Sequence, residues 1–287
     1  MRKKALLFVN SNKPAAKSIA PEICDTLDRR GYAAEVFSFE NKTEPCNPEK
    51  TDIGISLGGD GTVLFTSRIM APMGVPVMPV NLGTLGFIAA VPPEQWQETF
   101  DQWEKGKAVI SKRLMLDISI ERNGEIIFRS CALNDAVVSA AGIAKLVRLK
   151  LEAETASGDR IDLGHFRADG LIVATPTGST GYSVAAGGPI IDPEMDAVTI
   201  NPICPFTLAS RPIVVPSDER IITLVEKEQR SSIILTVDGQ ITFPLECDDR
   251  IIVHRSGFVL RLIASDRWAF YRALKTKLEW SGGQSRA

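Results

Sequence analysis

The stretch of sequence that decides the fold is Asp52-Ile-Gly-Ile-Ser-Leu-Gly-Gly-Asp-Gly-Thr-Val-Leu-Phe65. Its first part, residues 52–57, is apolar and of strand length, and predicts a buried strand. Thr62 then begins an apolar run whose spacing predicts a helix. The glycines between the two segments lack a Cβ, so the backbone can adopt positive φ and its N–H groups can closely approach an anion. Because the N-terminal end of a helix also attracts phosphate, the stretch predicts a strand, a turn and a helix that could hold phosphate.

Asp60 is the one charged residue of this glycine turn. A carboxylate repels phosphates unless it binds Mg²⁺ or takes a proton from a hydroxyl that attacks phosphorus. A tight turn from strand to helix, with the aspartate as the N-cap, would explain the same residues without any chemistry. The turn by itself leaves both interpretations open.

Strands and helices alternate through the first third of the chain. Gly31 is expected to end the first helix, and Trp96, Phe100 and Trp103 recur at helical spacing, which predicts that they lie in a core. The order predicts right-handed crossovers and a parallel sheet. The expected strands are residues 4–9, 32–39, 52–57 and 75–80, and the expected helices are residues 14–30, the segment from the glycine turn to about residue 70, and 92–105.

The pattern changes near Ser111, where apolar residues begin to alternate with polar ones. Arg122-Asn-Gly124 supplies a hairpin turn, and Asp238-Gly239 supplies another. A β-rich domain is therefore expected after the α/β domain, followed by a helix over residues 265–280 that could pack back onto the first domain. The later strands are expected at residues 116–120, 126–128, 136–139, 145–152, 171–174, 220–225, 233–237, 241–245, 250–253 and 258–263. The expected domains are residues 1–111, 112–264 and a helical tail of 265–287.

Length and composition limit the class of protein. The chain has 287 residues, 44% of them hydrophobic, which favours two domains over one. The net charge of −2 argues against a nucleic-acid partner and favours small molecules. The uncharged run of residues 69–93 contains five prolines and three glycines, which would break a membrane helix. Five widely spaced cysteines without a Cys-x-x-Cys pair are expected to be reduced and metal-free, and we expect a cytoplasmic protein without a membrane partner.

A second glycine-rich segment follows the expected strand of residues 171–174. It includes Thr175-Pro-Thr-Gly-Ser-Thr-Gly-Tyr-Ser183 and has no charged residue between Asp169 and Gly188. Its small residues allow a large ligand to lie against the backbone, and its hydroxyls can bind ribose, amide or phosphate groups. The alternative is a connecting loop that is rich in serine, threonine and glycine.

Four motifs in order carry a family resemblance. They are Gly58-Gly-Asp-Gly-Thr62, Asn81-Leu-Gly-Thr-Leu-Gly-Phe87, Leu133-Asn-Asp135 and the segment from Asp169 to Ser183. In sequence, order and separation they resemble the motifs of bacterial NAD kinases, and the resemblance covers nearly the whole chain. It implies transfer of the γ-phosphoryl of ATP, with a divalent metal such as Mg²⁺, to the 2′-hydroxyl of the adenosine ribose of NAD. It also implies an α/β fold with a Rossmann-like N-terminal domain and a parallel sheet, a C-terminal all-β sandwich, and a homodimer or homotetramer.

The resemblance also implies residue roles. Asp60 would orient the acceptor hydroxyl and take its proton, and the metal would be held mainly by nucleotide phosphates. Alternatives stay open for Asn134 and Asp135 as an Asx-type turn, for Lys145 as a solvated strand residue, and for Gln240 as an exposed turn residue. The expected NAD contacts are Asp60, Gly61, Asn134, Asp135, Lys145, Arg167, Asp169, Thr177, Thr180, Gly181, Tyr182, Ser183, Val184, Ala185 and Gln240. The expected ATP contacts are Gly58, Gly59, Thr62, Arg68, Asn81, Gly83 and Gly86.

One position departs from the family pattern, and two histidines need an interpretation. The family often has a basic residue where this chain has Phe65, five positions after the motif aspartate. Arg68 could replace that contact, although a phenylalanine packed in the core would explain Phe65 equally well. His165 and His254 lie in no metal or triad pattern and are interpreted as structural or surface residues.

Two other functions share some of these motifs. A lipid kinase for diacylglycerol or a sphingoid base has a similar Gly-Gly-Asp-Gly-Thr loop, but it needs an apolar acceptor cleft, whereas residues 175–183 suit a polar ligand. A non-catalytic dinucleotide sensor would have no need of a carboxylate beside the phosphates. The sequence does not decide between ATP and polyphosphate as the donor, or whether NADH is accepted.

Overall fold

The computed structural model describes residues 2–40, 46, 48–84, 86–142, 145–207 and 209–278. The chain forms two compact units, of which unit 1 comprises Met1–Arg113 with Phe258–Ala287, and unit 2 comprises Leu114–Gly257. Two strands, β5 (Ile110–Arg122) and β16 (Arg250–Ile263), belong in part to each unit. The two units are described one at a time.

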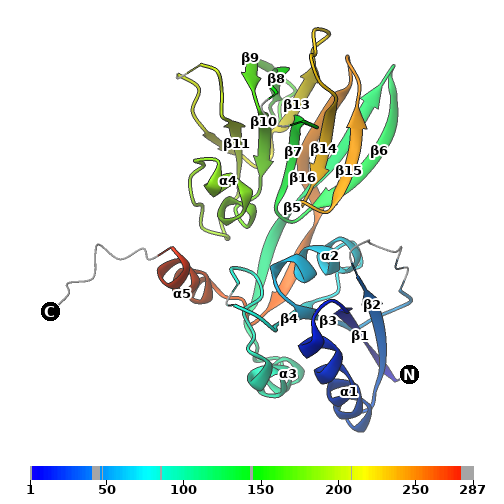
Figure 1. Ribbon diagram of the computed structural model, residues 1–287. Coiled ribbons are helices and arrows are strands. Elements are labelled where there is room, and N and C mark those ends of the chain that lie inside the picture. Colours follow the sequence, from blue (N-terminus) through cyan, green and yellow to red (C-terminus); the bar gives the residue numbers. More distant parts are fainter. Residues whose placement is uncertain are drawn as a thin grey trace, which may run out of the picture. The chain divides into compact units, whose positions relative to one another are not determined.

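Unit 1 has the alternating strands and helices that the sequence predicts. Its parallel strands run in the order β2-β1-β3-β4, and Leu262 of β16 pairs in parallel with Val77 of β4. Figure 1 shows helices α1 and α2 beside these strands. The elements are β1 (Lys3–Asn10), α1 (Pro14–Arg29), β2 (Tyr32–Phe39), β3 (Ile53–Gly58), α2 (Asp60–Met70) and β4 (Val77–Asn81).

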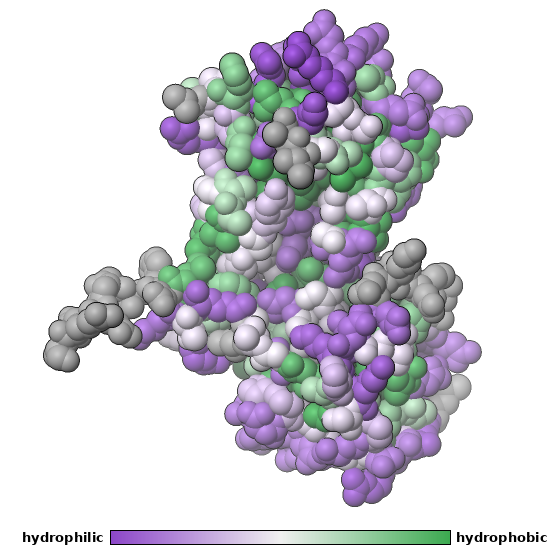
Figure 2. All heavy atoms as spheres, viewed as in Figure 1, coloured by the Kyte–Doolittle hydropathy of each residue, from purple (hydrophilic) through white to green (hydrophobic). Residues whose placement is uncertain are grey.

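Helix α1 forms because one of its faces is apolar. Ile23 and Leu27 are buried in the core of unit 1 together with residues of β1 and β3, while Lys17 and Glu22 are exposed. In the view of Figure 2, hydrophilic residues cover much of the surface around this helix. The helix ends where Gly31 adopts a φ of +84°, a conformation that glycine takes without steric cost, as predicted.

Two further helices complete unit 1. A short 3₁₀ segment (Pro93–Gln95) leads into α3 (Trp96–Glu104), and the predicted aromatic stripe does lie in the core, with Trp96 and Phe100 buried. Helix α5 (Arg267–Lys277) begins with Asp266, whose carboxylate accepts a hydrogen bond from the Ala269 N–H at 2.7 Å. The predicted end of this helix at residue 280 lies outside the described residues.

Unit 2 consists mainly of antiparallel strands. In one sheet the order is β12-β11-β10-β7-β14-β15; in the other, β16, β13, β8 and β9 are neighbours, and β5 pairs with β6 and β16. Side chains from both sheets share one hydrophobic core, which includes Leu149 of β8 and Leu235 of β14, so this is the predicted β-rich fold. The strands are β6 (Glu125–Ala132), β7 (Asp135–Ala140), β8 (Val147–Glu154), β9 (Arg160–Ala168), β10 (Gly170–Ala174), β11 (Ala197–Ile203), β12 (Ile213–Pro216), β13 (Arg220–Val225), β14 (Ile233–Val237) and β15 (Ile241–Leu245).

Several strands differ from the prediction. Strands β9, β11 and β12 were not expected from the sequence. Strand β11 contains Asn201 and Pro202, which weaken any strand signal, yet all of its residues are buried. In β9 the alternation is disturbed at Gly164, where φ is +97°. The two strands expected at residues 250–253 and 258–263 are one continuous strand, β16. The hairpin turn at Asn123 and Gly124, with φ values of 53° and 81°, is as predicted.

Neither a membrane helix nor a disulfide is found in the described part of the chain. None of its helices is long and apolar enough to span a bilayer. No disulfide joins its cysteines.

Candidate active site

The glycine turn of unit 1 is shaped by contacts that only glycine allows. A Cβ built on Gly58 would lie 2.0 Å from Thr62 Oγ1, so the first turn of α2 packs directly on the end of β3. Thr62 is buried, and its hydroxyl has no hydrogen-bond partner among the residues that the structure describes. The N-cap of α2 is Gly59, which has no side chain to cap the helix. The turn therefore leaves the N-terminal end of α2 without a side-chain acceptor from its cap.

The Asp60 carboxylate joins the two glycine motifs of unit 1. Its Oδ2 accepts a hydrogen bond from the Phe87 N–H at 3.0 Å, and its Oδ1 accepts from Ile88 and Ala89 at 3.2 and 2.9 Å. A Cβ on Gly86 would lie 1.9 Å from Oδ1, so any other residue there would displace the carboxylate. The aspartate is thus not the N-cap of α2. It is held by three backbone donors of the loop that follows β4.

Asn81 organises the start of that loop. Its side-chain amide donates to the Thr84 carbonyl at 2.9 Å, and its side-chain oxygen accepts from the Gly83 N–H at 3.1 Å. The Leu82 N–H donates to the Gly58 carbonyl at 2.7 Å, which ties the loop to the glycine turn. Both polar groups of Asn81 are thus used within the loop. Leu85 of the same motif lies outside the described residues.

Phe65 and Arg68 lie farther along α2. Phe65 is buried in an aromatic cluster, with ring centroids 5.9 Å from Phe8 and 4.5 Å from Phe39. Packing therefore explains the phenylalanine at this position. Arg68 lies in the last turn of α2, and its guanidinium is 5.9 Å from the Phe65 ring. It belongs to the opposite end of the helix from Asp60, where a cation is favoured by the helix dipole.

In unit 2, a second aspartate holds the turn that contains Asn134 and Asp135. Asp238 accepts hydrogen bonds from the backbone N–H groups of Leu133 at 3.1 Å, Asn134 at 2.7 Å and Asp135 at 3.3 Å. Sequence reasoning missed this role, because Asp238-Gly239 gives only a turn signal. The φ of +51° at Asp238 is consistent with the tight hairpin turn between β14 and β15.

Asp135 lies in different surroundings. Its side chain is buried, and no hydrogen bond to it is found among the described residues. Burial, with a smaller contribution from the charge of Asp238, raises the pKa of Asp135 to about 7. The residue lines a cavity of about 330 Å³ together with Asn134, Tyr182 and Asp238. The side-chain oxygen of Asn134 is also buried, without a hydrogen-bond partner in the described part of the chain. The turn therefore presents to the cavity a carboxyl group with a raised pKa and an amide oxygen without a hydrogen bond.

The hydroxyl-rich segment of unit 2 is fastened to this turn. The Thr175 hydroxyl donates to the Leu133 carbonyl at 2.6 Å and accepts from the Gly178 N–H at 3.0 Å. A Cβ on Gly178 would lie 2.1 Å from the Asn134 carbonyl oxygen, so the backbones are in close contact. A 3₁₀ turn (Gly178–Thr180) and a short helix α4 (Tyr182–Ala185) replace the expected irregular loop.

The expected contacts within this segment divide into two groups. The Thr180 hydroxyl donates to the Thr177 carbonyl at 3.1 Å, and the Ser183 carbonyl accepts from the Asn201 side-chain amide at 2.9 Å. These groups support the segment itself. Tyr182 is half exposed and lines the cavity beside Asn134 and Asp135, where its ring is available to a ligand. Of the other expected contacts there, Thr177 is buried, Gly181 and Val184 are partly buried, and Ala185 is exposed.

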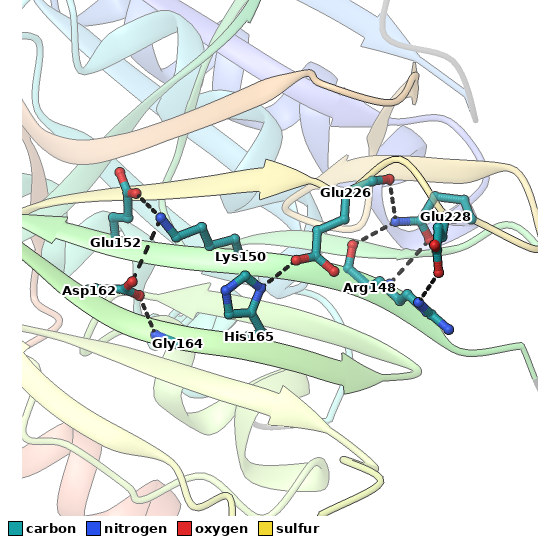
Figure 3. Close-up of polar contacts among 9 residues, drawn as sticks. Arg148, Lys150, Glu152, Asp162, Gly164, His165, Glu226 and Glu228 are labelled. Carbon is teal, nitrogen blue, oxygen red and sulfur yellow. Dashed lines mark hydrogen bonds and ion pairs between the residues drawn. The ribbon is translucent and has the colours of Figure 1, made fainter.

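Lys145 and Arg167 line a second cavity in unit 2. It has a volume of about 250 Å³ and also includes Arg148 and Arg230. The Arg167 guanidinium lies 4.9 Å from the Phe206 ring. Arg148 pairs with Glu228 at 2.5 Å, and Figure 3 shows this pair beside the contact of His165 with Glu226. The structure thus brings together two of the expected basic residues.

The remaining candidates are placed as follows. Asp169 is partly buried at the start of β10, where its N–H donates to the Ile203 carbonyl at 2.9 Å. Gln240 is partly buried in the turn after Asp238. Gly61 is exposed in the first turn of α2. His165 is exposed, and His254 contacts the Arg255 carbonyl at 2.9 Å, so neither histidine lines the cavities described above.

These observations define a nucleotide-binding protein with a phosphate-type turn in an α/β unit and a polar cavity in a β-rich unit. The family model of the ATP-NAD kinase N-terminal domain matches residues 5–108, and that of the C-terminal domain matches residues 133–265. The chain belongs to the ATP-NAD kinase family.

Similar proteins agree with this assignment. A protein named NAD kinase from Treponema denticola is 43% identical over 284 residues, which cover 99% of this chain and 98% of the relative. One from Geotalea daltonii is 37% identical over 286 residues, which cover 97% and 99%. The names of these relatives do not favour a lipid kinase or a non-catalytic sensor.

Solved structures give the same fold. An NAD kinase from Archaeoglobus fulgidus in complex with ATP has a TM-score of 0.72 and 25% identity, covering 98% of this chain and all of that one. A yeast NADH kinase complexed with NADH has a TM-score of 0.85 and 21% identity, covering all of this chain and 90% of that one.

Proposed function

We propose that this protein is an NAD kinase that transfers the γ-phosphoryl of ATP to the 2′-hydroxyl of the adenosine ribose of NAD, giving NADP and ADP. The family membership and the near full-length match to a named NAD kinase support this activity. The structural observation that carries it is the Asp60 carboxylate, which three backbone N–H groups hold beside the glycine turn.

Asp60 is the proposed catalytic base. A carboxylate oxygen has two lone pairs, and Oδ2 uses one of them for the Phe87 N–H, so one remains to accept the proton of the acceptor hydroxyl. As that proton moves to Asp60, the 2′-oxygen forms a bond to the γ-phosphorus, and the bond from phosphorus to the departing ADP oxygen breaks. The three hydrogen bonds fix the direction of the carboxylate before the reaction, which is what a positioned base requires.

The polar cavity of unit 2 supplies the proposed dinucleotide contacts. The unsatisfied side-chain oxygen of Asn134 can accept from the exocyclic amine of adenine, and the Asp135 carboxylate can accept from ribose hydroxyls. Tyr182 can stack on a base or a nicotinamide ring. Lys145 and Arg167, which share a basic cavity, are proposed to bind the pyrophosphate. The other proposed NAD contacts are Gly61, Asp169, Thr177, Thr180, Gly181, Ser183, Val184, Ala185 and Gln240.

ATP is proposed to bind at the glycine turn together with Mg²⁺. In the described residues there is no group of three or more histidine, cysteine, aspartate or glutamate side chains that could hold a metal. The Asp60 carboxylate is already bound to three N–H groups, so the donor set fits a metal carried mainly by nucleotide phosphates. When bound, Mg²⁺ would neutralise charge on the transferred phosphoryl group. The proposed phosphate contacts are Gly58, Gly59, Thr62, Arg68, Asn81, Gly83 and Gly86.

The proposal also covers where the protein is found and how many copies assemble. We infer a cytoplasmic enzyme that forms a homodimer or homotetramer. Light scattering of the purified protein would measure its mass directly.

The activity test is formation of NADP from ATP, Mg²⁺ and NAD by the purified protein. NADP is expected, as measured with an NADP-specific dehydrogenase, and phosphorus NMR should place the new phosphate on the 2′-oxygen. Reactions without ATP or without Mg²⁺ serve as controls and should give none. Absence of NADP with intact reagents, or phosphorylation of diacylglycerol or a sphingoid base instead, would overturn the assignment.

A further inference from the structure

Lys13 places a cation between the two glycine motifs of unit 1. It is the N-cap residue of α1, directly after β1, and sequence analysis did not single it out. A Cβ built on Gly59 would lie 3.4 Å from Lys13 Nζ, and one built on Gly83 would lie 3.2 Å from the same atom. The ammonium group therefore lies against the backbone of both the glycine turn and the loop after β4. Both positions are glycine, which leaves room for the ammonium group.

Folding alone does not account for this lysine. Among the described residues, no acidic side chain or hydrogen-bond acceptor pairs with its ammonium group, and α1 has no acidic residue in its first turn. The group lies near the N-terminal ends of two helices, α1 and α2, which carry positive dipole charge. A cation at such a place opposes folding. A bound anion would reverse this cost.

The same glycine turn holds a second unsatisfied polar group. The Thr62 hydroxyl is buried in the first turn of α2 and has no hydrogen-bond partner in the described ranges, although buried polar groups are normally hydrogen-bonded. Beside Gly83, a cavity of about 440 Å³ opens, which Ala15 of α1 and Leu82 also line. Its one acidic lining residue, Glu94, forms no ion pair in the described part of the chain. The described lining of this cavity has no basic side chain, so the positive charge for a group with several negatively charged oxygens would come from the Lys13 ammonium beside Gly83.

We propose that Lys13 binds the terminal phosphate oxygens of the phosphoryl donor, a nucleoside triphosphate, and so is a further catalytic residue. This inference rests on the proposed function. In a loose phosphoryl-transfer transition state, negative charge is spread over the equatorial oxygens of the transferred phosphoryl group, so an ammonium group beside these oxygens stabilises both the bound donor and the transition state. A lysine acts at phosphate as a point charge on a flexible stem, so it can follow the donor during the reaction.

The test compares Lys13→Met, Lys13→Arg and Lys17→Met. Methionine keeps an unbranched stem but removes the charge, and Lys17 is an exposed lysine of the same helix, four residues farther along. Titration calorimetry with ATP and Mg²⁺, and separately with inorganic tripolyphosphate, should show at least about tenfold weaker binding for Lys13→Met, close to wild-type binding for Lys17→Met, and partial recovery for Lys13→Arg. In the activity assay, the KM for ATP should rise and kcat should fall, while the KM for NAD changes less than about twofold.

Thermal unfolding without ligand distinguishes phosphate binding by Lys13 from a purely structural role of this residue. Lys13→Met should unfold at the same temperature as the wild type or higher, because an unpaired cation is removed from two positive helix ends. Wild-type affinity of Lys13→Met for both phosphate probes, or equal losses in Lys17→Met, would overturn the inference while leaving the kinase assignment intact. If the wild type made no NADP but Lys13→Met still lost tripolyphosphate binding, the kinase assignment would fail and the phosphate contact would stand.

Discussion

The glycine turn of unit 1 and the Asn134–Asp135 turn of unit 2 are both held by an aspartate that accepts three backbone N–H groups. In unit 1 that aspartate is Asp60, which is also the proposed base. In unit 2 it is Asp238, and a different residue, Asp135, lines the cavity with a carboxyl group that has no hydrogen bond among the described residues. In unit 1, one carboxylate both holds the loop and is the proposed base. In unit 2, Asp238 holds the turn, and Asp135 is the carboxyl group that a ligand would contact.

This difference has an energetic reason. A carboxylate that accepts several N–H groups is stable in its charged form even when it is partly buried. Asp135 is buried without such donors and beside another carboxylate, which raises its pKa to about 7. A ligand that donates hydroxyl groups would supply the missing donors.

The largest effect is expected from Asp60→Asn, which should lower kcat for NADP formation by about 10²–10⁴ because the base is lost. The asparagine amide would also face the Phe87 N–H, so one backbone hydrogen bond is lost and stability should fall by about 1 kcal/mol or more. Steady-state kinetics and chemical unfolding measure the two effects.

The matched control is Asp52→Asn, whose carboxylate accepts the Lys4 N–H at 2.8 Å at the start of the same strand, β3. It should keep turnover and lose less stability, because an asparagine oxygen can still accept the Lys4 N–H. A variant Gly86→Ala should behave like Asp60→Asn, because its Cβ would displace the carboxylate. Near wild-type turnover in either Asp60→Asn or Gly86→Ala would show that the carboxylate is only structural.

An intermediate effect is expected from Asp238→Asn. The amide would turn a donor toward the backbone N–H groups of residues 133–135, which should disturb the turn and raise the KM for NAD about tenfold, a change of about 1.4 kcal/mol. The KM for ATP should change little. Removing the Asp238 charge should also lower the pKa of Asp135, so the pH profile of NAD binding should shift toward lower pH. A lost NAD affinity without that pH shift would argue for general unfolding of the turn.

The smallest effect is the pH dependence of NAD binding through Asp135. Ribose hydroxyls that donate to its carboxylate favour the charged form, so affinity should weaken as the pH falls below about 7. Between pH 8 and pH 6 we expect a change of roughly three- to fivefold, which calorimetry can measure. In Asp135→Asn this part of the pH dependence should disappear, and its persistence would assign the titration to another group.

The folding stability should show the opposite dependence. Because the pKa of Asp135 is raised in the folded state, the stabilising contribution is complete below the unfolded value of about 4 and is lost as the pH rises through about 7. Relative to Asp135→Asn, the wild type should therefore become less stable between pH 5 and pH 8. Urea unfolding at several pH values would measure this trend.

Much of the architecture was predictable because the local signals were strong. The apolar segment before Gly58, the helical spacing after Thr62 and the glycine at position 31 each act within a few residues, and the structure agrees with all three. Strand β11 was missed because Asn201 and Pro202 oppose strand formation locally, while burial of both faces of the strand overrides that preference.

The sequence by itself determined the family, the order of strands and helices, and the residue types of both turns, because each depends on short-range spacing. Only the tertiary structure decided which carboxylate holds a turn and which is left for a ligand, because these roles depend on hydrogen bonds between residues far apart in the chain. Asp60 reaches a loop 27–29 residues away, and Asp238 reaches a turn 103–105 residues away. The ammonium of Lys13 likewise meets Gly59 and Gly83 only after the parallel strands have brought their ends together.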